Sequence, residues 1–543
     1  MNFKKLSFSC VLALAGLMTA NAGNIDVIAA RQAANDFLKK NVAAKGMFKA
    51  PSLADIKLAH TEASSVEGNA YYVFNIQGGG WIIMAGDDRA KQVLAYGENG
   101  NIDLNNLPVN MKGFLNMLKG QIETAQAYKG QTVPAKTIKL ATAVEPLLKT
   151  DWGQGEPFNR LCPLNGSGDR TSVGCGPLAM AQICYYWKYP NEVPDLPGYQ
   201  GTGYQWYSGM ESTTFDYSKM LDNYYIHNPE TGNPTDYAPF TEEQANEVAK
   251  LSRYCGQACK ARYGNANSTS TGSYTYDQRD AFLTFGFDEN MQLIGKDPSY
   301  YCSNSNKYTI EEWCELICTE LEAGRPIPYH DLYEGHAWVL DGVDADGKFH
   351  MNWGFNGRFN GWFEINALAF NPYGDSEVWD FSQGSNGGNE MIIGMYPYEG
   401  YVIPGAKTPK PVINYTITEN NVVFEATGDG EIHLYIDGVE YQSPCTYALG
   451  ASEKTVVVTA TAKMEGLSIS DNAEKSYLLP AKPFKLGDVN KDGDVTIADV
   501  SALIDILLEG TNSTVIDLRN EVNGYGDITI ADVSALIDKL LAV

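Results

Sequence analysis

Cys175 stands where the local sequence restricts the backbone most. Glycines flank it, Pro177 follows, and Leu178–Trp187 is then a mostly apolar run. Proline fits the first helical turn, where its missing N–H is not needed, so the pattern predicts a buried helix that begins at the cysteine. The dipole and the free N–H groups of a helix N-terminus favour a thiolate. The sequence therefore predicts a reactive thiol at Cys175, whereas Cys184, within the helix, has the setting of an inert buried thiol.

Composition excludes some classes of function. The chain has 543 residues, of which 44% are hydrophobic, and a net charge of −26. At roughly 100–200 residues per domain, this length allows about three to five domains with sizeable cores. The acidic surface repels phosphate backbones, so nucleic-acid binding is not expected.

The N-terminus predicts export. Lys4 and Lys5 precede an apolar run of 15 residues, Leu6–Ala20, and Ala20-Asn21-Ala22 is a small-x-small cleavage site. A spanning helix needs about 20 apolar residues, so 1–22 is interpreted as a cleaved signal peptide. We expect a secreted, periplasmic or cell-surface protein with no membrane-spanning segment.

The cysteines do not form a recognisable metal site. Removal of the signal peptide leaves nine, so at least one thiol is free or paired outside the chain. Cys255/Cys259 and Cys314/Cys318 are each spaced by one helical turn, but neither a CxxC pair nor a nearby histidine supports zinc. Buried thiols or a disulfide are favoured.

His336 is the predicted proton carrier for the thiol. A strand is expected over Ala337–Val343, and a turn at 345–347 would return the chain to a second strand that ends at Asn352. A hairpin would bring Asn352 near His336, where its amide oxygen would accept the imidazole proton, and Trp353 would shield that bond. Two other histidines remain open: His330 as a substrate-side residue or alternative base, and His350 as a structural residue.

Gln154 is a candidate for stabilising an oxyanion. It lies in a glycine-flanked turn 21 residues before Cys175. Acyl transfer needs hydrogen-bond donors at the developing oxyanion, and this side-chain amide and the Cys175 backbone N–H would supply two.

Three motifs together resemble one family. GQGEPFN, VGCGPLAMAQICYYWKYP and GHAWVLDGVD with NWGF are similar to streptopain and its relatives, the papain-fold cysteine endopeptidases. The segment YYVFNIQGGGWIIMAG with its continuation resembles the inhibitory propeptide of that family, and GSNGGNEMIIGMYP its active-site loop. The resemblance spans about 24–397, and these segments lie at 153–159, 173–190, 335–344, 352–355, 69–107 and 384–397.

The resemblance implies a mechanism and an activation step. Cys175 would be the nucleophile and His336 the general base and acid, with Gln154 in the oxyanion hole and Asn352 and Trp353 orienting the imidazole. It implies polypeptide substrates, a preference for a bulky apolar side chain two residues before the scissile bond, and no catalytic cofactor. The precursor would be latent until it is cut between Thr132 and Glu145. The Gly-Pro pair after the cysteine departs from the family pattern.

The last segment carries a duplicated motif. TIADVSALID occurs at 496–505 and at 529–538, and from Leu486 to the end there are 11 acidic and 3 basic residues. The oxygen-bearing residues before the first copy have the spacing of a calcium loop, with Asp494 offering its carbonyl and Thr496 reaching through water. The predicted ligands are Asp488, Asn490, Asp492, Asp494 and Asp499.

Residues 487–543 resemble a type I dockerin, which implies a cohesin-like receptor as partner for 485–543. In the second loop the corresponding positions hold Glu521, Asn523 and Tyr525, before Asp532. A carboxylate is thereby lost, which makes a second calcium ion doubtful.

The predicted class is α+β. It comprises a papain-like catalytic domain preceded by an α+β propeptide and followed by a small β-sandwich and an α-helical dockerin-like calcium-loop repeat. Two other readings stay open: a catalytically silent papain-fold adhesin, and a papain-fold acyltransferase. The expected segments are 1–22 (signal peptide), 23–143 (propeptide), 144–397 (peptidase), 398–484 (Ig-like β-sandwich) and 485–543 (dockerin-like).

Overall fold

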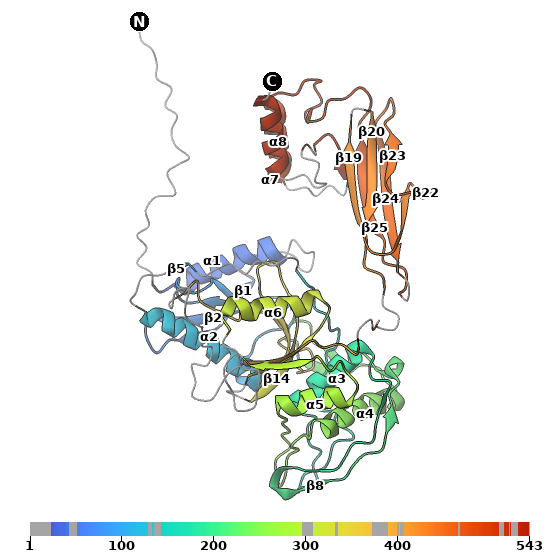
Figure 1. Ribbon diagram of the computed structural model, residues 1–543. Coiled ribbons are helices and arrows are strands. Elements are labelled where there is room, and N and C mark those ends of the chain that lie inside the picture. Colours follow the sequence, from blue (N-terminus) through green and yellow to red (C-terminus); the bar gives the residue numbers. More distant parts are fainter. Residues whose placement is uncertain are drawn as a thin grey trace. The chain divides into compact units, whose positions relative to one another are not determined.

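The computed structural model (Figure 1) describes most of the chain. The signal peptide and the ligand positions Glu521, Asn523 and Tyr525 lie outside the described residues, as does most of the predicted cleavable connector. The described residues are 23–42, 51–128, 133–134, 143–295, 308–331, 335–371, 389–398, 401, 407–418, 420–464, 467–509, 515–520, 522 and 530–541.

The chain divides into two compact units, 1–401 and 402–543. A ten-stranded sheet, in which every neighbouring pair is antiparallel, organises the first unit. In spatial order its strands are β1 (Ile56–Ala63), β2 (Asn69–Ile76), β3 (Trp81–Ala85), β4 (Val93–Gly97), β16 (Gly361–Phe363), β15 (Phe349–Asn352), β14 (His336–Val343), β13 (Ile327–Asp331), β18 (Asn389–Ile393) and β12 (Gln292–Gly295).

Two helices cover opposite faces of the N-terminal strands. Helix α1 (Val27–Phe37) packs on the face that carries Tyr72 and Phe74, and α2 (Val109–Ala127) packs on the face that carries Tyr71 and Val73. This follows from the strand period of two, which sends alternate side chains to opposite faces. Strands β2 and β3 pair as an antiparallel hairpin, in the register Asn75 opposite Trp81.

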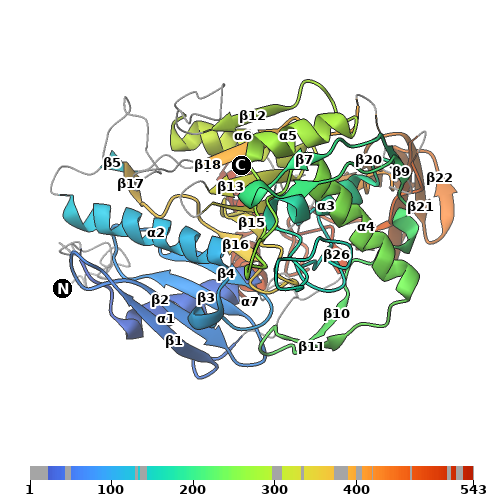
Figure 2. The ribbon, with the colours of Figure 1, turned by 90° about the horizontal axis from the view of Figure 1, so that it is seen from below.

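The N-terminal region (residues 23–143) and the region that follows it (residues 144–397) share one sheet and one core. Strand β4 pairs with β16, so that Tyr96 lies opposite Trp362 (Figure 2). Phe114 of α2 lies edge-on to two tryptophans of the other region, with ring centroids 6.2 Å from Trp338 and 5.9 Å from Trp353. The sequence did not predict this joint, because strand pairing between distant segments leaves no local pattern.

Helices and short hairpins complete the first unit. Threonine capping boxes begin two of the helices, since each Thr side chain accepts the N3 amide while the N3 side chain accepts the N-cap amide. The helices are α3 (Cys175–Trp187), α4 (Glu242–Ala258), α5 (Thr275–Thr284) and α6 (Ile310–Glu322). The short strand pairs are β6 (Glu192–Val193) with β9 (Thr213–Thr214), β7 (Tyr199–Gln200) with β8 (Trp206–Tyr207), β10 (Tyr225–His227) with β11 (Pro234–Tyr237), and β5 (Val133–Pro134) with β17 (Phe370–Asn371).

The second unit contains two sheets around one core, together with two helices. The sheets are β19 (Val412–Ile417), β20 (Asn421–Thr427) and β23 (Cys445–Ala448), and β22 (Val439–Tyr441), β21 (Glu431–Ile436), β24 (Lys454–Lys463), β25 (Ala473–Leu479) and β26 (Val515–Asp517). The helices are α7 (Ile497–Glu509) and α8 (Ile530–Leu541).

One feature of this unit differs from expectation. We predicted an all-helical C-terminal repeat separate from the β-sandwich, but β26 comes from between the repeats and pairs in parallel with β25. The two segments therefore share a sheet. No helix among the described residues is long and apolar enough to cross a membrane.

We predict that Phe114→Ala destabilises the unprocessed chain. It removes a side chain that is 2% exposed and that contacts both tryptophans. Such truncations in a core cost about 3–5 kcal/mol of unfolding free energy. Urea unfolding of the precursor measures this cost, with Val109→Ala on an exposed position of α2 as control. Equal midpoints for the two variants would show that α2 does not anchor the shared core.

Candidate active site

Helix α3 begins at the candidate nucleophile, as the sequence predicts. Its N-cap is Gly174, whose φ of +95° favours glycine, and a Cβ there would lie 2.9 Å from the Thr271 side chain. The glycine thus allows a sharp entry into the helix next to the chain at 271. Nearly all of α3 is buried, which fixes where Cys175 lies.

The Cys175 thiol lies among backbone amides. The backbone N–H groups of Ala337, Gly176 and Cys175 itself lie near its sulfur, and each of them favours the thiolate. The residue is nevertheless only 8% exposed, and burial outweighs these bonds and raises the pKa of Cys175 above its ordinary value. In this state the thiol is therefore protonated, although it is surrounded by groups that would stabilise its anion.

His336 is the first residue of β14 and directly precedes Ala337, whose amide reaches the sulfur. The structure therefore brings the strand of the predicted proton carrier to the nucleophile. The predicted hairpin is also present, because β14 pairs antiparallel with β15. Its register places Asn352 opposite Val339, three residues along the strand from His336.

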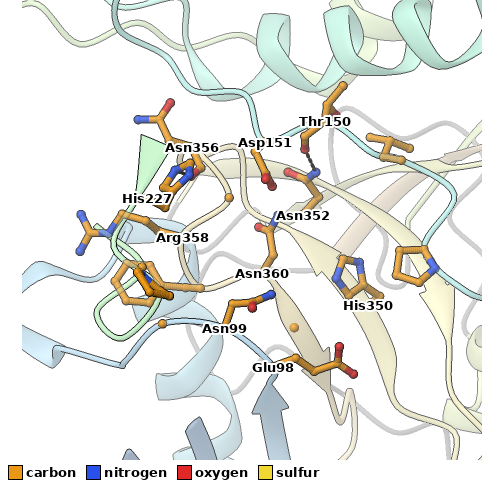
Figure 3. A pocket seen from close by; sticks show the side chains of 18 of the residues that line it. Glu98, Asn99, Thr150, Asp151, His227, His350, Asn352, Asn356, Arg358 and Asn360 are labelled. Atoms are coloured by element: carbon orange, nitrogen blue, oxygen red, sulfur yellow. Dashed lines mark hydrogen bonds between the residues drawn. The ribbon is translucent and has the colours of Figure 1, made fainter. Parts of the chain in front are cut away.

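The hydrogen bonds described for Asn352 differ from the one we predicted. Its Nδ2 donates to the Thr150 carbonyl at 2.8 Å (Figure 3), and its Oδ1 accepts the Gly354 N–H at 3.1 Å. An amide oxygen can accept two hydrogen bonds, so the predicted bond from His336 to this oxygen stays a prediction.

Trp353 lies in the shared core. It is 1% exposed, its ring centroid is 5.0 Å from that of Trp338, and Phe114 of α2 packs against both rings. Its role in shielding a hydrogen bond of the imidazole stays a prediction. Helix α2 covers the Trp353 ring through Phe114.

Gln154 lies beside the nucleophile's loop. Its carbonyl accepts the N–H of Val173, two residues before Cys175, at 2.9 Å. The glycine-flanked turn predicted from the sequence therefore stands next to the start of α3. Whether the side-chain amide reaches an oxyanion remains a prediction.

Two further residues lie beside the site, His330, which the sequence analysis names as a substrate-side residue or alternative base, and Gln278, which it does not name. His330 on β13 is 3% exposed and lies opposite Ala337 in the ladder, and Gln278 of α5 contacts its ring with a distance of 2.8 Å between the two Nε2 atoms. His330 had been considered as an alternative base, whereas Gln278 gave no signal, because an isolated glutamine in a short helix is unremarkable.

A polar cavity of about 340 Å³ lies at the joint between the N-terminal region and the peptidase region. Residues 98–101 form one wall, and Asn352 and Thr150 form part of another. Asp151 points into this cavity (Figure 3). Burial raises the pKa of Asp151, while the charges of His227 and His350 oppose that rise.

His350 has a structural partner. Its Nδ1 donates to Asp341, which is fully buried, at 2.6 Å. This agrees with the structural interpretation of His350.

The predicted calcium loop wraps around its own backbone amides. Asp488 accepts the N–H groups of Asp492 and Gly493, and Asp499 accepts those of Asn490 and Thr496. Burial alone raises the pKa of Asp499, but the backbone hydrogen bonds outweigh it and hold that pKa below its ordinary value. The Asp499 carboxylate is therefore ionised. Among the residues that the structure describes, no group of three or more His, Cys, Asp and Glu side chains lies close enough together to hold a metal ion, so calcium binding stays a prediction.

The remaining predicted ligands and the second repeat are only partly described. Asn490 Oδ1 accepts the Asp492 N–H, and the Asp494 side chain pairs with Lys485, which leaves the predicted carbonyl role of Asp494 open. In the second repeat Asp532, fully buried, accepts the N–H of Val522. Asp499 and Asp532, which occupy corresponding positions in the two repeats, thus both accept backbone N–H groups.

Comparison with known proteins places this geometry in a family. Residues 152–363 match the Peptidase C10 family, and residues 22–122 match the Spi protease inhibitor family. Residues 152–363 are therefore a cysteine peptidase domain similar to the Peptidase C10 family. The inhibitor match covers the N-terminal helices and strands that share the peptidase core.

Its relatives are moderately similar in sequence. The thiol protease/hemagglutinin PrtT of Porphyromonas gingivalis is 27% identical over 443 residues, which cover 78% of this chain and 47% of the relative. Streptopain of Streptococcus pyogenes is 27% identical over 437 residues, which cover 73% of this chain and all of the relative. Among solved structures, a fragment of Prevotella intermedia prointerpain A is 27% identical, with a TM-score of 0.49, over 63% of this chain and 98% of that one. The peptidase thus spans about half the length of PrtT and the full length of streptopain.

We predict that the Cys175 thiol of the unprocessed peptidase is alkylated slowly at pH 7. Because burial raises its pKa, the reactive thiolate is scarce at neutral pH and increases only as the pH rises towards and beyond the ordinary thiol value. Iodoacetamide labelling of Cys175, followed by peptide mass spectrometry at pH 6 to 10, measures this. A rate at pH 7 equal to that of a free low-pKa thiolate would contradict the structure.

Proposed function

We propose that the chain is the latent precursor of an exported cysteine endopeptidase, in which Cys175 attacks the peptide carbonyl and His336 carries the proton. The observation that supports this most strongly is the contact between the Cys175 sulfur and the amide of Ala337. That contact joins the start of a buried helix to the strand that begins with His336. Export rests on the signal peptide predicted at 1–22.

The proposed chemistry follows from these groups. With His336 as imidazolium, Cys175 is a thiolate that attacks the carbonyl carbon and forms an oxyanion. The backbone N–H of Cys175 and the Gln154 side chain stabilise that oxyanion. His336 then protonates the leaving amine, and water hydrolyses the thioester. Asn352 and Trp353 orient and shield the imidazole in the processed enzyme.

Latency is proposed to come from the N-terminal region. That region contributes strands to the peptidase sheet and a helix over Trp338 and Trp353, while Cys175 is buried. Cleavage between Thr132 and Glu145 would separate it from the peptidase chain. The family match of residues 22–122 to a protease inhibitor supports this role.

The substrates are proposed to be polypeptides, with a bulky apolar side chain two residues before the cut. A catalytically silent adhesin would not need three backbone N–H groups around a buried thiol, so this arrangement favours an enzyme over an adhesin. An acyltransferase would share this chemistry and would differ only in the acceptor. Product analysis with an added amine separates the acyltransferase from the hydrolase.

We predict that wild-type precursor loses its N-terminal region under reducing conditions and then cleaves casein. Cys175→Ala stays full length and inactive, because no other thiol replaces the nucleophile. Cys184→Ala, the same change on the same helix, still processes itself. Mass spectrometry of the N-terminus and a casein assay report both steps.

A second set of outcomes decides between catalysis and binding. His336→Ala, cut by an added protease, should lose at least about a thousandfold in kcat/KM, as for other acid–base residues of such a dyad. If wild-type protein cut near 132–145 does not cleave casein, the peptidase proposal is wrong.

We further propose that 487–499 binds one calcium ion and that 485–543 binds a cohesin-like receptor. The support is that the Asp488 and Asp499 carboxylates each accept backbone amides of this loop, and that the duplicated helices pack on each other through Leu503 and Leu536. The predicted ligands are hard oxygen donors at the spacing that calcium takes.

We predict that millimolar calcium raises the melting temperature of residues 402–543 and that Asp499→Asn abolishes the rise. Asp499 holds the loop through two backbone amides, so the variant loses a ligand charge. Asp505→Asn, on the following helix, is the control. Calorimetry with calcium and with a chelator measures the shift. An equal shift in Asp499→Asn would overturn the assignment.

A further inference from the structure

Two buried polar side chains lie between the candidate nucleophile and the candidate proton carrier. Gln278 of α5 is 0% exposed and His330 of β13 is 3% exposed, and their Nε2 atoms are 2.8 Å apart. In the β13–β14 ladder His330 lies opposite Ala337 and Asp331 lies opposite His336. His330 thus lies directly opposite Ala337, whose amide contacts Cys175, and one register position from His336, the predicted base.

Gln278 also lies against the residue that follows the nucleophile. A Cβ at Gly176 would lie 2.4 Å from the Gln278 Nε2 and 2.2 Å from the Ser273 Oγ. Both distances are too short for any side chain, so only glycine leaves room for this amide. The glycine after the cysteine, which departs from the family pattern, therefore has a local structural reason.

The hydrogen bonds fix the protonation state of His330. An amide nitrogen can only donate, so Gln278 donates to Nε2 of His330 and the ring carries its proton on Nδ1. Gln278 also donates to Ser273 Oγ at 3.1 Å, which holds the amide in this orientation. With its lone pair occupied, the ring has no free site for a second proton.

The surroundings of His330 act in the same direction. Burial, together with repulsion from His336, lowers the pKa of His330 to about 3. Other titratable groups on neighbouring strands and helices include Glu390, opposite it on β18, Asp331 on its own strand, Cys175 on α3 and the buried Asp277 on α5. Hydrogen-bond geometry and burial therefore agree that the ring is neutral.

We propose that Gln278 and His330 are positioning residues that keep the imidazole beside His336 uncharged, so that His336 is the single imidazole of this site that takes up a proton in the working range. This inference rests on the proposed peptidase function. A second cation here would disfavour the imidazolium of His336, which the thiolate needs as its partner. The pair thereby extends activity towards acid pH.

The test uses Gln278→Met in the processed enzyme. Methionine has a similar volume but cannot donate, so the His330 lone pair becomes free to bind a proton. We expect an additional ionisation at acid pH in the pH profile of kcat/KM. The ratio of kcat/KM at pH 5 to that at pH 7.5 should fall about three- to tenfold relative to wild type, which corresponds to a shift of roughly half to one pH unit.

Controls separate this role from a structural one. Gln257→Met on α4 removes another buried amide, which donates to the Pro197 and Ser208 carbonyls, and should leave the pH 5 to pH 7.5 ratio unchanged. The double variant Gln278→Met/His330→Gln should return that ratio to within about twofold of wild type, since no second imidazole is left to titrate. Gly176→Ala, which displaces Gln278, should show the same change in the ratio as Gln278→Met.

The outcomes distinguish the two proposals. If Gln278→Met lowers kcat/KM equally at all pH values, or if the double variant keeps the altered ratio, the positioning role is wrong while the peptidase function stands. If His330→Gln alone abolishes activity more than a thousandfold, His330 is itself the base and both assignments fail. Should Gln278→Met not fold, Gln278→Asn, whose shorter amide does not reach His330, is measured in the same way.

Discussion

The contact between the Cys175 sulfur and the Ala337 amide is the interaction on which the site depends. It holds the first turn of α3 against the first residues of β14. The nucleophile and the proton carrier therefore belong to two rigid elements. Both elements are buried, and the amides around the sulfur need no rearrangement to stabilise an anion. Burial limits the reactivity of the thiol, because it is the largest influence on the pKa of Cys175.

The N-terminal region shares a sheet and a core with residues 144–397. It does not simply lie on the surface: β4 extends the peptidase sheet through β16, and Phe114 packs on Trp338 and Trp353. A segment held by backbone pairing and by aromatic contacts stays bound until the chain is cut. The match of this region to a protease inhibitor family agrees with such an arrangement.

Local patterns in the sequence predicted local structure well. The helix at Cys175, the β14–β15 hairpin and the turns of the calcium loop each follow from residues within about 20 positions of one another. What the sequence did not predict depends on pairing between distant segments. Strand β4 pairs with β16, and Gln278 reaches His330 from a helix 52 residues away. Neither contact leaves a periodic signal in the chain.

We propose that the peptidase is latent because its nucleophilic thiol is buried and protonated. The most direct measurement is the thiolate absorbance near 240 nm against pH, as the difference between wild type and Cys175→Ala, before and after removal of the N-terminal region. Cys175 is expected to titrate above its ordinary pKa in the precursor and well below neutrality in the processed enzyme. A thiolate already present at neutral pH in the precursor would contradict it.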